Sequence, residues 1–338
     1  MKLIIFVFSL LFVATTMAQP VKWKARKYFT VVSYNVENLF DTLAQSKLDE
    51  EFTPESKKNW NTERYYKKLN NIAQVIDSIN PNELPEIIGV VEIENRTVLE
   101  DLIKTDILAK GKYKIVHQDG PDPRGIDCAL LYRSDAFEYL THQAIEVRFP
   151  FADNKRTRDI LYVKGLVNRD TLHFFVNHWS SRRGGEDESE PKRMQSALTL
   201  KNVTDSITRV NPLAKIIIMG DFNDEPSNKS LKESLQAGTI SDNTHLKNLL
   251  YEAYTKGKGS YYYRGDYNMI DNFIVSNPLL AANKGFRLFT PNGYIFNAEF
   301  ICYTNKNGDK SPNRTYGGNN YYGGFSDHFP VFSIFYQK

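Results

Sequence analysis

Six apolar segments of this sequence carry carboxylate, amide or imidazole side chains at or near one end. When such groups gather in one place, carboxylate oxygens suit a hard divalent cation, and imidazoles and amides hydrogen-bond phosphate oxygens. Taken singly, each could close a turn, because Asn and Asp are common at strand ends. Their repetition predicts one shared site for a cation and a phosphate group. Its candidate residues are Asn35, Glu37, Glu92, Asn177, His178, Asp221, Asn223, Asp271, Asp327 and His328.

Two of these positions carry the most information. Glu92 directly follows the apolar run "IIGVV", and "GDFND", at Gly220–Asp224, directly follows "KIIIM". A carboxylate that is buried without a partner is costly. A carboxylate at the end of a buried segment therefore favours a bound cation or a polar cluster over a simple turn.

Apolar patterning predicts the strands that must hold these groups. "KIIIMG" and "EIIGVVEIEN" are typical of buried strands. Strands are expected over residues 27–35, 86–95, 126–134, 159–168, 171–179, 215–220, 267–276 and 329–337. The segment Asn305–Gly324, rich in Asn, Gly and Tyr, is expected to be a loop.

Helical spacing predicts two helices. Over 62–80 the apolar residues share one face and Pro81 ends the helix. A second helix is expected from Ser189, with Pro191 in its first turn. The predicted apolar faces are Leu69, Ile72, Ile76 and Ile79 in the first helix, and Ala197, Leu200, Val203 and Ile207 in the second. Strands and helices alternate early and strands dominate later, which predicts one α/β domain of packed sheets flanked by helices.

The first eighteen residues predict a secretory signal peptide. One Lys precedes an apolar stretch from Leu3 to Ala14, and Thr16 and Ala18 provide small residues before a cleavage point. The alternative, a membrane anchor, would need about 20 apolar residues. We therefore expect an exported protein, periplasmic or extracellular, without a stable membrane anchor. A monomer is expected.

Composition narrows the class further. The chain has 338 residues, 41% of them apolar, which allows a sizeable core, and its net charge of +3 is too small to argue for a polyanion partner by itself. Cys128 and Cys302 could form one disulfide in an oxidising compartment or remain separate thiols. Cys128, in "IDCALLYR", is typical of a small buried residue.

The ordered motifs "SYNVENLF", "GVVEIEN", "NHWSSRRGG", "GDFND", "MIDNFIVS" and "SDHFPV" resemble those of the endonuclease/exonuclease/phosphatase superfamily, which includes DNase I, exonuclease III and sphingomyelinases. The resemblance runs from about residue 28 to the C-terminus, and "RGIDCALLYR" and "NHWSSRRGG" are most similar to its secreted bacterial nuclease-like branch. It implies a DNase I-like fold, a four-layer α/β/β/α sandwich of two mixed β-sheets.

The resemblance also implies roles for individual residues. Glu92 would be the principal metal ligand, with Glu37 standing where many relatives have Asp. The full metal set would be Glu92, Glu37, Asn35 and Asp327, and the catalytic set His178, Asp221, Asn223, Asp271 and His328. The implied cofactor is Mg²⁺, with Mn²⁺ or Ca²⁺ as alternatives.

Four further residues are expected to contact the substrate phosphate. Arg182 and Arg183, followed by two glycines, could clamp phosphate oxygens, although a solvated charge run is the alternative because four acids follow. Arg124, in "DPRGID", could bind substrate or stabilise a turn. Asn177 completes the set.

The motifs leave the phosphate ester open. A nuclease acting on DNA, with RNA as a second substrate, is favoured. The alternatives are a sphingomyelinase-type lipid phosphodiesterase, for which "GSYYYRGDY" and "NNYYGGF" could supply aromatic membrane contacts, and a phosphomonoesterase or phosphoinositide phosphatase. A binding module on an inactive scaffold should have lost at least one motif residue, and none is lost.

Overall fold

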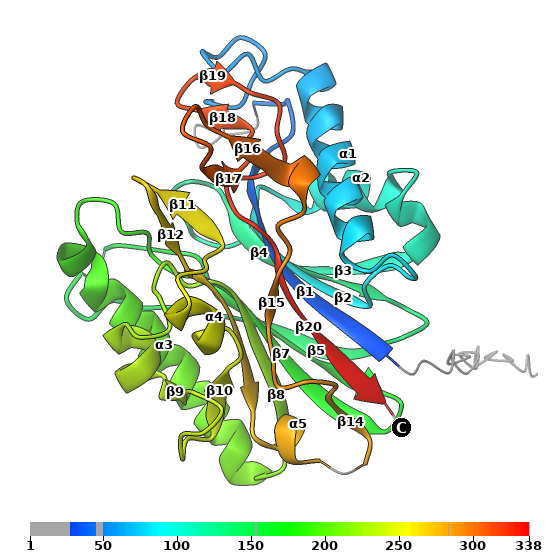
Figure 1. Cartoon of the computed structure of the whole chain (residues 1–338), viewed down its shortest axis with the longest axis vertical. Helices are drawn as coiled ribbons and strands as arrows, with labels where there is room; N and C mark the ends of the chain where they lie inside the picture. The colour runs from blue at the N-terminus through cyan, green and yellow to red at the C-terminus, as the bar shows by residue number, and fades with distance from the viewer. Residues whose placement is uncertain (1–27, 45–49, 153, 283, 338) are drawn as a thin grey trace, which may run out of the picture.

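The computed structural model describes residues 28–44, 50–152, 154–282 and 284–337 (Figure 1). The predicted signal peptide, residues 1–18, lies outside the described residues. None of the helices in the described part of the chain is both long and apolar enough to cross a membrane.

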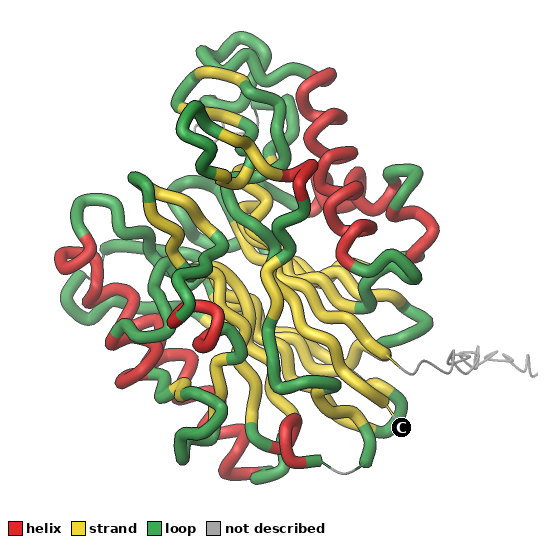
Figure 2. The backbone as a smooth tube through the Cα atoms, in the orientation of Figure 1, coloured by secondary structure: helices red, strands yellow, loops and turns green. Residues whose placement is uncertain are grey.

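Two seven-stranded sheets form the centre of the molecule (Figures 1 and 2). The first has the order β14-β20-β1-β2-β4-β3, with β15 paired to β20, and the second has the order β5-β6-β7-β8-β13-β10-β9. Both are mixed, because β1 with β2 and β7 with β8 are parallel pairs among antiparallel ones. The strands of the first sheet are β1 (Tyr28–Leu39), β2 (Ile87–Ile93), β3 (Tyr113–His117), β4 (Asp127–Arg133), β14 (Phe286–Leu288), β15 (Tyr294–Ile295) and β20 (Val331–Gln337). Those of the second are β5 (Glu138–Ile145), β6 (Ile160–Val167), β7 (Asp170–His178), β8 (Lys215–Asp221), β9 (Ala237–Gly238), β10 (Leu246–Asn248) and β13 (Asp271–Ser276).

The continuous apolar runs of β2 and β8 arise because both faces of these strands are buried. In β8, Ile217 and Met219 pack between the sheets, while Ile216 and Ile218 pack under a helix layer. In β2, Ile87 likewise faces the other sheet and Ile88 faces the helices on the opposite side.

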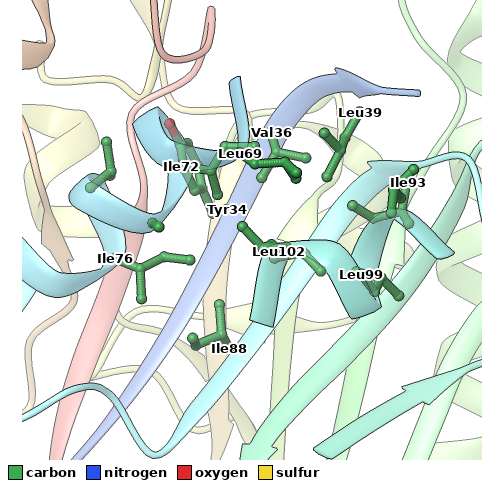
Figure 3. Close-up of a cluster of buried hydrophobic side chains, with 14 of the residues drawn as sticks. Tyr34, Val36, Leu39, Leu69, Ile72, Ile76, Ile88, Ile93, Leu99 and Leu102 are labelled. Carbon is green, nitrogen blue, oxygen red and sulfur yellow. The ribbon is translucent and has the colours of Figure 1, made fainter. Parts of the chain in front are cut away.

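Helices cover the outer face of each sheet. The helices are α1 (Thr62–Ile79), α2 (Arg96–Lys104), α3 (Glu186–Val210), α4 (Tyr251–Thr255) and α5 (Pro278–Ala281), with single turns at Leu108–Gly111, Ser230–Ser234 and Glu299–Ile301. Figure 3 shows α1 and α2 seated on β1 and β2 through buried apolar side chains, which include Leu69, Ile72 and Ile76 of the predicted face. α3 covers the second sheet through Ala197 and Leu200. The predicted four-layer α/β/β/α sandwich is therefore confirmed.

Two local expectations need correction. α3 begins at Glu186, not Ser189, so Pro191 lies inside the helix. The earlier start places Glu186, Asp187 and Glu188 in the first turn, where negative charge is favourable to the helix dipole. Within the expected loop Asn305–Gly324, short hairpins form instead.

These hairpins lie outside the two large sheets. β16 (Cys302–Thr304) pairs with β17 (Lys310–Pro312), and β18 (Tyr316–Gly317) pairs with β19 (Asn320–Tyr321). A third hairpin joins β11 (Tyr261–Tyr263) to β12 (Asp266–Asn268). Figure 1 shows β16–β17 and β18–β19 at one end of the molecule, with β11–β12 nearer the middle.

The two cysteines are both free thiols, which decides the question that their spacing left open. Cys128 is buried, as its apolar context predicts, and Cys302 is partly exposed.

Candidate active site

Strand pairing brings distant polar residues to one edge of the sandwich. The parallel pairing of β7 and β8 sets His178 opposite Asp221, and the antiparallel pairing of β13 sets Asp271 opposite the same residue. From the other sheet, Asn35 of β1 donates from Nδ2 to Asp221 Oδ2 at 3.0 Å. Glu92 Oε1 of β2 lies 3.8 Å from His178 Nε2. The two sheets therefore contribute to a single cluster.

His328, just before β20, forms a tight pair with Asp271. Its Nδ1 lies 2.6 Å from Asp271 Oδ2, and the Ser260 hydroxyl donates to the same oxygen at 2.6 Å. Burial by itself would lower the pKa of His328, but Asp271, with Asp221 and Asp327, raises that pKa well above its usual value. His328 is therefore an imidazolium that can donate a proton from Nε2.

Asp221 is held between two donors. Besides Asn35 on Oδ2, its Oδ1 accepts the backbone N–H of Asn223 at 2.8 Å. Burial, reinforced by the charge of Asp271, raises the pKa of Asp221 to about 7 despite the opposing effect of His328. A carboxylate with a pKa near neutrality suits proton transfer to and from water. Gly220 makes this geometry possible, because with φ of +138° its backbone approaches that of Asn177 too closely for any Cβ.

His178 is neutral, in contrast to His328. Burial lowers its pKa well below the usual value, and the charges of Arg158, Arg124 and His328 act in the same direction. Its Nε2 lies 3.6 Å from Asp221 Oδ2 and 3.8 Å from Glu92 Oε1. The two imidazoles therefore differ in charge, although both lie within 4 Å of Asp221 Oδ2, at 3.6 Å for His178 and 3.9 Å for His328.

Glu92 is an ionised carboxylate in a strained backbone position. Its φ of 67° is unusual for a residue other than glycine, and the β2–β4 register is irregular between Val91 and Ile93. Burial alone would raise the pKa of Glu92, but Arg124, His328 and the Asn38 N–H lower it. Oε2 accepts that N–H at 2.9 Å, and Oε1 lies 3.4 Å from Arg124 Nη2.

The structure places Glu37 away from this cluster. Its two carboxylate oxygens accept the backbone N–H groups of Thr315 and Tyr316 at 2.6 and 3.1 Å, and Lys68 Nζ lies 3.8 Å away. Burial, together with Asp327, raises the pKa of Glu37 to about 7. Glu37 therefore anchors the C-terminal segment, and its geometry does not favour the metal-ligand role implied by the resemblance.

Asn177 is likewise structural. It is fully buried, donating from Nδ2 to the carbonyls of Phe175 and Met219 and accepting the Trp179 indole N–H. Since all these partners are internal, the expected contact with substrate phosphate is not available to Asn177.

The two arginines of "SSRRGG" have different surroundings. Arg182 makes internal hydrogen bonds, donating to the Asn223 carbonyl at 2.8 Å and to Asn228 Oδ1 at 3.1 Å. Arg183 is exposed. Of the two, Arg183 is therefore the one placed to receive a phosphate.

A cavity of about 820 Å³ lies over the cluster, and we call it the central cavity. Its lining residues include Glu92, Arg124, His178, Arg182, Arg183, Asp221, Asn223, Tyr261, Asp327 and His328. Asn35, Glu37, Asn177 and Asp271 do not line it. Asn35 and Asp271 instead hold Asp221 and His328 from behind.

Some residues of the site carry no motif signal. Ser260 supports Asp271, and the Tyr261 ring lies 4.8 Å from that of His328. Buried Arg158 pairs with Asp122 at 2.8 Å and donates to the carbonyl of His178 at 3.1 Å. Asp122 lies in "DPRGID", but its partner Arg158 is 36 positions away, and Ser260 is 11 positions from Asp271, so only the folded chain shows these contacts.

The donor set fits a hard divalent cation. Asp221, Asp271 and His328 have donor atoms within 4.8 Å of one another, but Asp271 is already paired with His328. Glu92 is the better candidate, because its carboxylate is ionised and buried and the residue lines the central cavity. Asp327, also on the cavity wall, could contribute a further oxygen.

Comparisons with known proteins identify the family. The family model described as "Endonuclease/Exonuclease/phosphatase family" matches residues 30–338. A search of curated proteins found no match.

Solved structures share the fold at low sequence identity. D. rerio TDP2 complexed with single strand DNA product has a TM-score of 0.55 at 15% identity, covering 92% of this chain and 99% of that one. A Bacteroides thetaiotaomicron endonuclease/exonuclease/phosphatase family protein has a TM-score of 0.55 at 17% identity, covering 92% and 98%. The mannosyl-6-phosphatase Bt3783 of the same organism has a TM-score of 0.53 at 17% identity, covering 91% and 99%. By its match to the family model over residues 30–338, the chain belongs to the endonuclease/exonuclease/phosphatase family and is a hydrolase of phosphate esters.

Proposed function

We propose that the protein is an exported, divalent-metal-dependent nuclease that hydrolyses phosphodiester bonds of DNA, with RNA as a second substrate. The observation that carries this proposal is a second cavity of about 630 Å³, the basic cavity, which shares Arg124, Ser181 and Arg183 with the central cavity. Its lining adds the cations Lys155, Arg156, Arg158 and Lys192. A chain of phosphates needs successive cations beyond the reacting centre, whereas a monoester does not.

Not every one of these cations is free to bind substrate. Arg158 is buried against Asp122, and Arg156 pairs with Glu146. Lys155 and Arg183 are exposed, and Arg124 is half-exposed beside Glu92. Lys155, Arg183 and Arg124 therefore give the basic cavity positive charge that can contact substrate, next to the cluster rather than on a distant face.

The chemistry follows from the charge states. A divalent cation, held by Glu92 with Asp327, would act as a Lewis acid on the phosphate. His328, protonated and fixed by Asp271, donates to a phosphate oxygen, and neutral His178 donates from another side. Asp221, with a pKa of about 7, orients a water molecule and accepts its proton.

The structural neighbours show what controls are needed. The TDP2 structure holds single strand DNA product, which supports a nucleic acid as substrate of this fold. The neighbour named as a mannosyl-6-phosphatase supports a monoester equally well on fold alone. The alternatives must therefore be assayed beside DNA.

The test is hydrolysis of plasmid DNA by the protein from Gln19 onward, with Mg²⁺, Mn²⁺ or Ca²⁺ and with EDTA. Parallel reactions hold RNA, sphingomyelin and a sugar monophosphate. We expect nicking and then linearisation, abolished by EDTA and reduced about 10²-fold or more in His328→Ala. His142→Ala, on the exposed part of β5, is the matched control and should behave as wild type. Intact plasmid, with release of choline phosphate or free phosphate from the other substrates, would contradict the nuclease proposal and leave a phosphate ester hydrolase.

Export is a separate proposal, supported by the apolar segment from Leu3 to Ala14 and the small residues Thr16 and Ala18. The full-length protein is expressed in a bacterial host, recovered from the extracytoplasmic fraction and sequenced from its N-terminus. We expect Gln19 as the first residue, and retention in the cytoplasm when residues 2–18 are deleted. Recovery of an uncleaved N-terminus outside the cytoplasm would contradict cleavage at this point.

A further inference from the structure

A third cavity, of about 670 Å³, adjoins the central cavity. Four tyrosines dominate its lining, and we call it the tyrosine cavity: Tyr262, Tyr303, Tyr321 and Tyr322. They come from the β11–β12, β16–β17 and β18–β19 hairpins and their ends, outside the two large sheets. The neighbouring wall belongs to Asp327, which lines both cavities.

Asp327 lies between charged groups of the two cavities. Asp327 Oδ1 lies 3.9 Å from His328 Nε2, and Asp327 Oδ2 lies 3.7 Å from Arg314 Nη2. Arg314 lines the tyrosine cavity, while His328 lines the central one. A phosphate beside His328 would therefore lie next to Asp327, the residue that also lines the tyrosine cavity.

Two of the four tyrosine rings pack against other side chains of the protein, and the other two are exposed to a ligand. The Arg64 guanidinium covers Tyr321 at 4.2 Å, and Tyr267 packs edge-on against Tyr262 at 5.1 Å. Tyr303 and Tyr322, by contrast, are 56% and 59% exposed. Large aromatic side chains that stay exposed inside a cavity are suited to a planar ring as ligand.

The polar groups of the cavity favour a nucleobase over a lipid chain. Ser311 and Asn313 contribute a hydroxyl and an amide to the lining, and Arg314, which also lines the cavity, lies beside Asp327. A nucleobase presents a flat face for stacking and a hydrogen-bonding edge for such groups, whereas an acyl chain would leave them without partners.

We propose that the tyrosine cavity binds the base of a nucleotide adjacent to the scissile phosphate, with Tyr303 and Tyr322 as its stacking partners. The proposal rests on the proposed nuclease function and adds a site for the base. Stacking of this kind accepts any base, since every base has a π-face. The cavity therefore contributes affinity and position without selecting sequence.

The test uses hexathymidylates in which one central linkage is a phosphodiester and the others are phosphorothioates, which retain the charge. One has both flanking bases, one lacks the base on the 5′ side of the cleavable linkage, and one lacks the base on the 3′ side. For the wild type we expect kcat/KM to fall about tenfold when one of the two bases is removed and to change little for the other.

The variants locate the base. Tyr303→Ala and Tyr322→Ala should each lose about tenfold on the intact oligonucleotide, with no further loss on the oligonucleotide lacking the critical base. Tyr303→Phe and Tyr322→Phe, which keep the ring, should retain most of the activity. Tyr139→Ala, at an exposed tyrosine of β5, is the control and should match wild type on all three.

Two results would overturn the proposal in different ways. If the wild type cleaves all three oligonucleotides equally, or the alanine variants lose the same factor on each, the base site is wrong while the nuclease function stands. If no oligonucleotide is cleaved but a sugar monophosphate or sphingomyelin is, the nuclease function is wrong and the base site is lost with it.

Discussion

His328 Nδ1 lies 2.6 Å from Asp271 Oδ2, although 57 positions separate the two residues in the chain. Asp271 begins β13 of the second sheet, and His328 stands before β20 of the first. Their contact therefore crosses from one sheet to the other and depends on the face-to-face packing of the sandwich. It also raises the pKa of His328, which lines the central cavity and whose Nε2 lies 3.5 Å from Asn35 Nδ2.

The first prediction concerns this pair. Asp271→Asn should lower kcat about 10²–10⁴-fold with little change in KM, because the amide no longer holds His328 protonated and oriented. The measurement is steady-state hydrolysis of the best substrate. Asp77→Asn, on the exposed face of α1, is the matched control. Normal kcat in Asp271→Asn would show that the charge of His328 is not needed for turnover.

The second prediction concerns the metal. Glu92→Gln should raise the Kd for Mn²⁺ at least tenfold, because an ionised carboxylate is replaced by a neutral amide in a buried position. Titration calorimetry of the full protein measures the affinity, independently of activity. Glu55→Gln, at an exposed glutamate outside the site, is the matched control and should bind Mn²⁺ as tightly as the wild type. Unchanged affinity in Glu92→Gln would move the metal to other ligands.

The third prediction separates Glu37 from Glu92. Glu37→Gln should lower the free energy of unfolding by about 2 kcal/mol, because the carboxylate accepts the N–H groups of Thr315 and Tyr316 and faces buried Lys68. Denaturant titration measures this loss. Mn²⁺ affinity of the folded variant should match wild type, and a loss of affinity like that of Glu92→Gln would restore Glu37 as a ligand.

The sequence predicts which backbone positions reach the site better than it predicts what their side chains contact. Apolar runs and motif order identify β1, β2, β7, β8 and β13, and the polar residues at their ends do meet at one edge. Glu37 and Asn177 also stand in motifs, yet both side chains face internal partners. The partner of Glu37 is 278 positions away, at Thr315, in a segment without a clear pattern.

The tyrosine cavity could not be predicted from the sequence for the same reason. Its rings lie on short hairpins that follow no long apolar periodicity, so composition alone predicts a loop at Asn305–Gly324. Only the folded chain shows that Tyr303 and Tyr322 share a cavity with Tyr262 of a different hairpin. The contacts of Glu37 and the lining of the tyrosine cavity both depend on packing between distant segments of the chain, which local sequence propensity does not predict.

The last prediction concerns the pH dependence of stability, through a residue outside the site. Burial, with the nearby charge of Lys164, lowers the pKa of His173 to about 4, and its Nδ1 lies 2.8 Å from the Tyr162 hydroxyl. An unfolded His has a pKa of about 6.5, so between these two values the unfolded chain binds a proton that the folded chain does not. Stability due to His173 is therefore fully present above pH 6.5 and is lost progressively as the pH falls towards 4.

Denaturant titrations of wild type and His173→Phe at pH 7.5 and pH 5 should show the wild type losing ~1–2 kcal/mol more than the variant over this interval. Other titrating groups are common to both proteins and cancel in the difference. Equal losses would mean that His173 takes up its proton in the folded protein as readily as in the unfolded one.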